Sequence, residues 1–163
     1  MDDAVLNKVL WMAPYGLFLV GSRAGEERNG MTGSLFMQVS FAPVTVAVAV
    51  ENGAVTRRLI DAGRVFSVNW WAREETRVFV KFSRPATQEG AALNGWAFHD
   101  GVTGAPIFDD AVSYVDCTVN ASHDAGTHTV FYGEVRDAGI QHPDVALARM
   151  EDTRMKYGGV ARH

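Results

Sequence analysis

The chain has 163 residues, about the size of one domain, and we expect residues 1–163 to fold around a single hydrophobic core. Apolar residues make up 47% of the sequence and charged residues 21%, proportions that exclude a largely disordered chain. The formal net charge is -4 and the sequence has no basic run, so we expect no nucleic-acid partner.

The first forty residues predict a helix followed by two strands. Aliphatic residues recur at helical spacing between positions 5 and 10, behind two acidic residues that suit a helix N-terminus. Residues 15–20 predict a strand that ends at Gly21, and residues 25–30 predict a glycine-bearing surface loop. Residues 32–40 alternate by twos, so one strand should carry a mostly polar face and an apolar face.

The rest of the chain predicts more strands than helices. The β-branched run at residues 45–50 is typical of a buried strand, and residues 56–63 predict a helix capped by the hydroxyl of Thr56. The pattern of residues 74–82 fits both a strand and a helix. The other expected elements are strands at 65–70, 111–119 and 127–136, a helical turn at 88–93 and a loop at 101–106. Many short strands with few helices predict a closed antiparallel β-barrel.

The polar face of residues 32–40 is the candidate ligand site. Its hydroxyl and amide side chains follow Asn29 and Gly30, and a glycine lets backbone N–H groups approach an anion closely. Arg57 stands at the start of the following helix, where exposed N–H groups also favour a phosphate. These residues equally suit the outer face of a half-exposed strand and a solvated helix, so spacing alone leaves both interpretations open.

Nine short segments in order along nearly the whole chain add a second line of evidence. They are residues 29–34 (NGMTGS), 36–43 (FMQVSFAP), 46–50 (VAVAV), 56–60 (TRRLI), 63–69 (GRVFSVN), 104–107 (GAPI), 111–117 (AVSYVDC), 128–135 (HTVFYGEV) and 157–159 (YGG). In this order they resemble flavin reductase-like proteins of the FMN-binding split-barrel class. The resemblance implies a mainly β, antiparallel split β-barrel of Greek-key type with a few short peripheral helices, and it makes residues 74–82 a helix.

The resemblance also implies a cofactor site and a reaction. It implies a homodimer that holds FMN, or FAD, near the barrel mouth and the subunit interface, and that receives hydride from transiently bound NADH or NADPH. The cofactor-binding positions that it implies are Asn29, Met31, Thr32, Ser34, Gln38, Val39, Ser40, Thr56, Arg57 and Tyr157. Gln38, Val39 and Ser40 would lie along the flavin ring. His128 would be the catalytic residue that hydrogen-bonds the nicotinamide or the flavin edge, although an exposed histidine on a strand explains it equally well.

One position departs from the family pattern, because Thr127 stands where the family has an aspartate before the histidine. Three functions stay open, the weakest being a split barrel that binds another planar cofactor or serves only as an interaction domain. The first is an NAD(P)H:flavin reductase, which could supply reduced flavin to a monooxygenase partner. The alternative is an FMN-retaining, flavoredoxin-like electron-transfer module that exchanges electrons with a protein such as a rubredoxin-like carrier, and the missing aspartate favours it. No motif distinguishes NADH from NADPH.

Three further expectations concern metal, compartment and membrane. His123, Asp124 and His128 have no cysteine or second carboxylate nearby, so we expect no metal site. Cys117 is the only cysteine and the start of the chain lacks the order of a signal peptide, so we expect a cytoplasmic protein. The longest apolar runs, such as residues 44–50, fall well short of the roughly 20 residues of a membrane helix.

Overall fold

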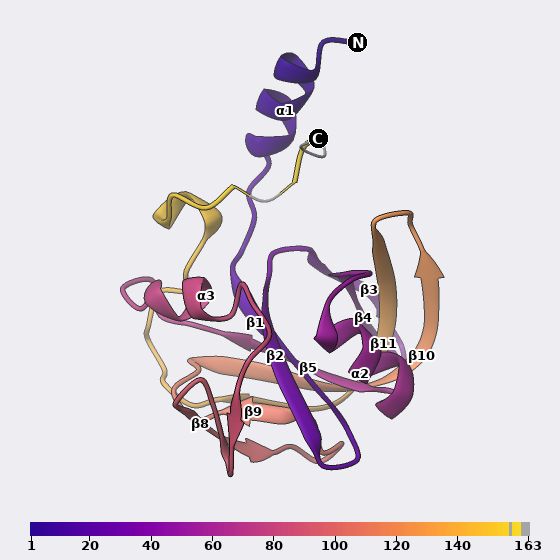
Figure 1. Cartoon of the computed structure of the whole chain (residues 1–163), viewed down its shortest axis with the longest axis vertical. Helices are drawn as coiled ribbons and strands as arrows, with labels where there is room; N and C mark the ends of the chain where they lie inside the picture. Colours follow the sequence, from indigo (N-terminus) through magenta and orange to yellow (C-terminus); the bar gives the residue numbers. More distant parts are fainter. Residues whose placement is uncertain (157, 161–163) are drawn as a thin grey trace.

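Strands dominate the computed structural model, which describes residues 1–156 and 158–160 (Figure 1). Seven of them form one antiparallel sheet: β1 (Phe18–Ala24), β2 (Glu27–Gly33), β3 (Phe36–Phe41), β4 (Val44–Glu51), β5 (Val65–Trp70), β10 (Ser113–Asp124) and β11 (His128–Ile140). A smaller sheet holds β6 (Gln88–Glu89), β7 (Ala92–Leu93), β8 (Trp96–Asp100) and β9 (Pro106–Phe108). The helices are α1 (Asp3–Trp11), α2 (Val55–Gly63), α3 (Arg77–Lys81) and the 3₁₀ turn η1 (Met150–Asp152).

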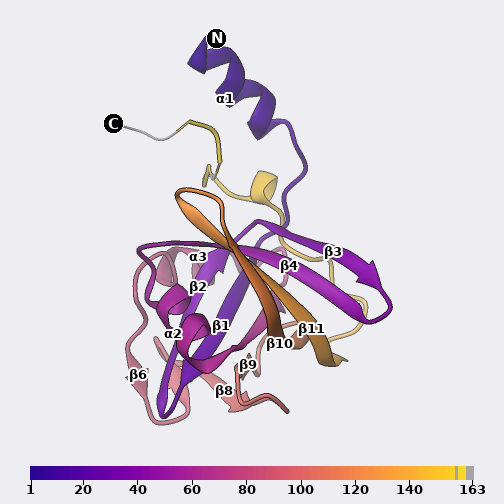
Figure 2. The same ribbon diagram turned by 90° about the vertical axis from the view of Figure 1, so that its right-hand side faces the viewer.

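The large sheet has the strand order β2-β1-β5-β10-β11-β4-β3 and is strongly bent. In Figure 2 the ribbons of β10 and β11 run across the direction of β1 and β2. The mainly β, antiparallel architecture with few short helices is confirmed. The closed barrel that the strand pattern predicts is wrong, because within the described chain β2 and β3 remain edges of the sheet and no ladder joins them.

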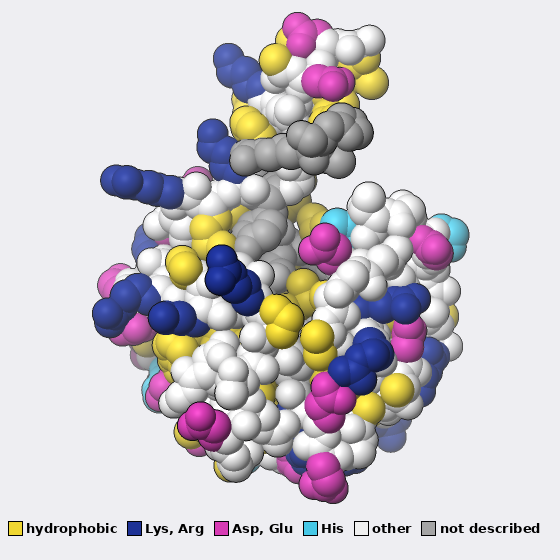
Figure 3. All heavy atoms as spheres, viewed as in Figure 1, with side chains coloured by type: hydrophobic (Ala, Val, Ile, Leu, Met, Phe, Trp, Pro, Cys, Tyr) yellow, Lys and Arg dark blue, Asp and Glu magenta, His cyan; other side chains and the backbone are white. Residues whose placement is uncertain are grey.

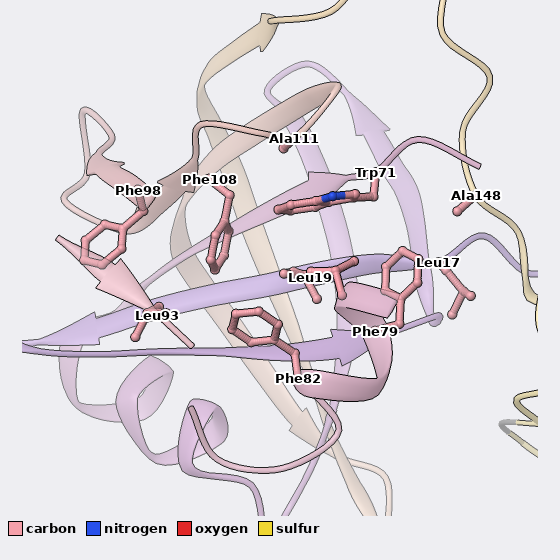
Figure 4. Close-up of a cluster of buried hydrophobic side chains, with 11 residues drawn as sticks. Leu17, Leu19, Trp71, Phe79, Phe82, Leu93, Phe98, Phe108, Ala111 and Ala148 are labelled. Atoms are coloured by element: carbon pink, nitrogen blue, oxygen red, sulfur yellow. The ribbon is translucent and has the colours of Figure 1, made fainter. Parts of the chain in front are cut away.

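Two clusters of buried side chains stabilise this arrangement, and the chain through β1 contributes to both because its side chains alternate. Phe18 and Val20 lie in the cluster between the strands of the large sheet, with Phe66, Phe131 and Ile60 of α2. Leu17 and Leu19, which alternate with them along the chain, belong to the second cluster, where α3 and the small sheet pack on the other face (Figure 4). The other large members of this cluster are Trp71, Phe79, Phe82, Leu93 and Phe108. Full burial of each large apolar side chain contributes about 1.5–3 kcal/mol.

The predicted first helix is confirmed as α1, whose N-cap carboxylate on Asp2 accepts a hydrogen bond from the Ala4 amide at 2.8 Å. It stands clear of the strands in Figures 1 and 2 and buries none of its own residues. Its described contacts are with the end of the chain, where the Trp11 indole donates to the Gly158 carbonyl at 3.2 Å. None of the helices in the described part of the chain has the length and hydropathy to cross a bilayer.

The predictions for the two inner helices differ in outcome. The helix that ends at Gly63 is confirmed as α2, and Arg64 closes it with a left-handed φ of 58°. Its N-cap residue is Ala54, which makes no side-chain cap, so the capping role expected of Thr56 is wrong. Residues 74–82 contain the short helix α3, as the family resemblance implies.

Two strand predictions are wrong in the first half of the chain. Residues 25–30 are mostly strand, because β1 continues through Gly21 to Ala24 and pairs with β2 as far as Glu27. The single strand expected at residues 32–40 is two strands, since β2 ends at Gly33 and β3 begins at Phe36. Near the end of β2 the Thr32 amide donates to the Phe82 carbonyl, directly after α3, at 2.9 Å.

The second half follows the predicted pattern more closely. The run at residues 45–50 is β4, and residues 65–70 are β5. β10 and β11 cover most of the strands expected at residues 111–119 and 127–136: β10 begins two residues later than expected and β11 one, and both extend further to make one long hairpin. The helical turn expected at residues 88–93 is wrong: β6 and β7 pair there, and the Gln88 side chain accepts a hydrogen bond from the Arg28 amide at 2.9 Å.

Candidate functional site

A cleft of about 280 Å3, here called the α2 cleft, opens where the N-terminus of α2 meets the middle of β2 and the end of β4. Residues 82–85, which follow α3, form its remaining wall. Four of the predicted site residues line it together: Asn29, Met31, Thr32 and Thr56. The fold therefore brings together residues that are up to 27 positions apart, as the hydrogen bond between Thr56 and Asn29 records.

Hydrogen bonds inside the protein occupy the hydroxyl groups of the cleft. The Thr56 hydroxyl is fully buried and donates to Oδ1 of Asn29 at 3.3 Å. The Thr32 hydroxyl donates to the Phe79 carbonyl at 2.7 Å. Both side chains therefore shape the wall, and the sequence-based idea that their hydroxyls face an anion does not follow from this geometry. Their role in binding a cofactor stays a prediction.

Backbone and one arginine supply the donors that an anion could use. Ala54 gives α2 no side-chain cap, so the N-cap residue leaves the first-turn N–H groups at the cleft open to another acceptor. Arg84 is exposed, lines the opposite wall and makes no ion pair within the described residues. A phosphate needs such a combination of backbone donors and a guanidinium. Sequence reasoning missed Arg84, and its only local signal is its place in a Ser-Arg-Pro run after the helix.

The arginines at the start of α2 are engaged elsewhere. Arg57 pairs with Asp61 at 2.9 Å and is outside the cleft lining, and its Nε is buried without a hydrogen-bond partner among the described atoms. Arg58 pairs with Glu27 at 2.6 Å, and this guanidinium lowers the pKa of Glu27. Arg57 is thus engaged with Asp61, and its predicted contact with a phosphate stays a prediction.

His128 lies beside the cleft as the first residue of β11, directly opposite Glu51 of β4. Glu51 lines the cleft, so the histidine is one strand away from it. The ring Nδ1 is 2.9 Å from the hydroxyl of Thr127, the residue at the position of the family's aspartate. The hairpin is anchored by Asn52, which accepts from the Thr129 hydroxyl at 2.7 Å and donates to the Gly126 carbonyl at 2.7 Å. The Thr127 hydroxyl can thus orient the His128 ring.

Two more of the predicted residues line a second hollow, here called the β3 groove, with a volume of about 500 Å3, whereas Gln38 and Ser40 are not part of its lining. Ser34 and Val39 line it, over a floor of β4 and β11 side chains. Val39 sits at a break in register between β3 and β4. Gln38 and Ser40 flank it, and the Gln38 amide donates to the Ser40 carbonyl at 3.1 Å. Tyr157 lies outside the described residues.

Other titratable groups give no sign of a metal or a reactive thiol. Within the described residues, no group of three or more His, Cys, Asp or Glu side chains is placed to hold a metal ion. Burial raises the pKa of the Cys117 thiol to about 12, which suits a core residue and not a nucleophile. Burial also raises the pKa of Asp116, whose carboxylate accepts hydrogen bonds from the amide and hydroxyl of Thr103. Basic and acidic side chains are interspersed over the face in Figure 3.

Comparison with known proteins identifies the family. A model described as the flavin reductase like domain matches residues 12–158. The chain belongs to this family. An NADH-dependent FAD reductase of Streptomyces globisporus is 30% identical over 137 residues, covering 82% of this chain and 74% of that protein. A high molecular weight rubredoxin of Moorella thermoacetica is 29% identical over 136 residues, covering 82% of this chain but only 59% of its own length.

Solved structures agree with this assignment. The NADH:FAD oxidoreductase of Streptomyces globisporus C-1027, in complex with NAD and FAD fragments, matches with a TM-score of 0.72 at 26% identity, over 83% of this chain and 79% of that one. The flavin reductase component of a bacterial two-component tryptophan halogenase matches with a TM-score of 0.74 at 26% identity, over 85% of this chain and 88% of that one. The fold is therefore that of the flavin reductases, and the expected split-barrel class is confirmed.

Proposed function

We propose that this protein is an NAD(P)H:flavin oxidoreductase that transfers a hydride from a reduced nicotinamide to FMN or FAD. The observation that carries the proposal is the α2 cleft, whose lining holds both the helix N-terminus without a side-chain cap and Arg84, which has no ion pair among the described residues, in a member of the flavin reductase family. The bound flavin supplies the ring that accepts the hydride. The residues of the chain bind and orient it.

The α2 cleft is the proposed place for the phosphate end of the flavin. Backbone N–H groups of the first turn of α2 donate to phosphate oxygens, and Arg84 supplies the compensating positive charge. The buried pair of Thr56 and Asn29 fixes the wall between helix and strand, so the donors keep their positions when the phosphate is absent. In this proposal the α2 backbone and Arg84 bind the phosphate, whereas Thr56 and Asn29 keep the shape of the cleft.

The β3 groove is the proposed place for the flavin ring. The chain passes from Thr32 in the cleft to Ser34 in the groove within two residues, so a ligand that follows this segment reaches both hollows. Among the described residues the groove has no charged side chain in its lining, which favours a flat, largely apolar ring. At the break in register around Val39, backbone groups freed from the ladder can bond the polar edge of the ring.

His128 is proposed to position the nicotinamide. It lies one strand from the cleft, and the Thr127 hydroxyl restrains its Nδ1 side. The other ring nitrogen is then free to meet the carboxamide of the nicotinamide or the flavin edge. No proton transfer by the protein is required in this arrangement, because hydride transfer depends on stacking and distance.

A second candidate function is a module that keeps its FMN and exchanges electrons with a protein. The similarity to a high molecular weight rubredoxin and the replacement of the family's aspartate by Thr127 favour it. Mixing purified protein with excess flavin and NADH or NADPH, and following the nicotinamide absorbance, separates the two. Rapid turnover supports the reductase, and flavin retention without turnover supports the electron-transfer module. A protein that neither turns over nicotinamide nor retains flavin contradicts both functions.

For partners, we infer a homodimer and a protein that consumes reduced flavin. Met37, Val39, Phe41 and Val44 form an exposed apolar surface on the β3–β4 hairpin, with Phe41 87% exposed, and a second copy would cover it. The similarity to the reductase component of a two-component halogenase supports a monooxygenase or halogenase as the consumer. Light scattering during gel filtration tests the dimer, and a monomer at micromolar concentration contradicts it.

A further inference from the structure

Helix α1 presents apolar side chains that the described residues of its own chain leave uncovered. Val5, Val9 and Met12 follow one another at one-turn spacing along one side of the helix and are 58%, 58% and 76% exposed. The helix has nine residues, and isolated helices shorter than about 12–15 residues are marginal in water unless another surface packs on them. This side, here called the α1 ridge, therefore needs a covering surface.

The root of α1 is tied beside the end of the chain and not to the sheet. The Met150 amide, at the start of η1, donates to the Tyr15 carbonyl at 2.9 Å. On the helix itself, the Asn7 side chain accepts a hydrogen bond from the Val160 amide at 2.7 Å. In both ribbon views α1 stands off the strands (Figures 1 and 2). These contacts hold the helix away from the strands of its own chain.

The exposed apolar surface of the β3–β4 hairpin, formed by Met37, Val39, Phe41 and Val44 and here called the hairpin surface, matches the α1 ridge in chemistry. Neither surface contains a charged side chain, and each is large enough in apolar side chains to mark a place of contact. Met37 and Val39 also line the β3 groove. A helix that packs on the hairpin surface therefore adds a wall to the groove.

The charges of α1 favour a protein surface over a lipid surface as its cover. Helices that lie on anionic membranes are rich in Lys and Arg on their polar side. The polar side chains at the start of α1 are the carboxylates of Asp2 and Asp3, and Lys8 is the only cationic side chain of the helix. An anionic bilayer would thus attract this helix weakly.

We propose that the α1 ridge of one copy packs on the hairpin surface of a second copy, so that each β3 groove is completed by a helix of the partner subunit. A two-fold axis makes such contacts reciprocal, and one arrangement then covers both uncovered surfaces of both chains. The inference deepens the homodimer inferred above. Its statement about the groove rests on the proposed function, because it assumes that the groove receives the flavin ring.

Cross-linking between two distinguishable chains tests the contact. One chain carries Val9→Cys and a long affinity tag, the other carries Phe41→Cys without a tag, and the two are produced together so that mixed dimers form. A short bismaleimide should link them into a product with the mass of one tagged and one untagged chain. Cys117 is buried, so the parent protein should stay unlinked. Val102→Cys, in the exposed loop between β8 and β9, replaces Phe41→Cys as the control and should give no such product.

A charge placed on the α1 ridge tests whether the groove depends on this contact. Val9→Asp should raise the dissociation constant of the dimer about tenfold and the Kd of riboflavin about threefold, since the groove loses an apolar wall. Val102→Asp places the same charge on another exposed valine and should change neither constant. Far-ultraviolet circular dichroism verifies that Val9→Asp folds, as expected for a helix with no buried residue.

Two results overturn the inference while leaving the proposed function intact. The first is an active dimer in which the Val9→Cys and Phe41→Cys chains are linked no more than the Val102→Cys control. The second is a Val9→Asp variant with both constants of the parent. A monomeric parent contradicts the homodimer and this packing together. A parent that binds no flavin contradicts the proposed function, whereas the cross-link still decides the packing of α1.

Discussion

Replacing Arg84 by alanine removes the one cationic side chain that lines the α2 cleft in the described chain. A hydrogen bond to a charged group contributes about 1.5–3 kcal/mol when it is shielded from water. Because Arg84 is exposed, solvent screening reduces this value, and we expect a loss of about 1.4 kcal/mol in flavin binding. That loss corresponds to a roughly tenfold increase in the Kd of FMN or FAD.

Fluorescence titration with two controls makes the Arg84 test specific. Riboflavin lacks the phosphate, so its Kd should change less than twofold in Arg84→Ala. Lys81→Ala removes an exposed cation at the end of α3, outside the cleft, and should leave all three Kd values unchanged. An equal effect of Arg84→Ala on riboflavin and on FMN would refute the reasoning, because the arginine would then act on something other than the phosphate.

The remaining predictions concern catalysis, pH and packing. His128→Ala should lower NADH turnover by at least tenfold and change the flavin Kd less than twofold; equal effects on both would remove its assignment. Burial raises the pKa of Asp116, so its protonated form favours the folded state, and stability is lost as pH rises from about 4 through the raised pKa. Urea unfolding should therefore show Asp116→Asn gaining stability relative to the parent over this window, and a constant difference would contradict the assignment. Gly133→Ala should cost about 1–3 kcal/mol in thermal or urea unfolding, because its Cβ would lie 2.5 Å from the Phe66 ring, whereas Gly16→Ala meets nothing within 4 Å and should be neutral.

Local pattern was sufficient where burial alone determines the structure. The β-branched run of β4 and the short apolar run of β5 each form strands that are largely buried. Their side chains prefer extended backbone, and no special contact is needed to explain them. The family resemblance added what pattern left ambiguous, since it made residues 74–82 helical against the β-branched residues at Val78 and Val80.

Local pattern failed where a distant partner determines the backbone. The alternation of residues 32–40 reads as one strand, but the hydroxyl of Thr32 bonds to the carbonyl of Phe79, 47 residues away. The hairpin of β6 and β7 likewise depends on Gln88, whose side chain bonds to Arg28, 60 residues away. Such contacts leave no periodic signal in the sequence, so they could be found only in the folded chain.

The candidate site shows the same division. Asn29, Met31, Thr32 and Thr56 were predicted, and the fold brings them to one cleft. Arg84 and Glu51 were missed, because an exposed charge after a helix or at the end of a strand is usually solvated. They become candidates for ligand binding only because both line the cleft, and the packing of α3 against β2 brings Arg84 there.

Anaerobic mixing of the flavin-loaded protein with NADH, followed in the visible absorption of the flavin, tests whether hydride is transferred at this site. The flavin band should be bleached in step with oxidation of one NADH per flavin, and His128→Ala should slow this bleaching. A loaded protein whose flavin remains oxidised with both NADH and NADPH would contradict hydride transfer at this site.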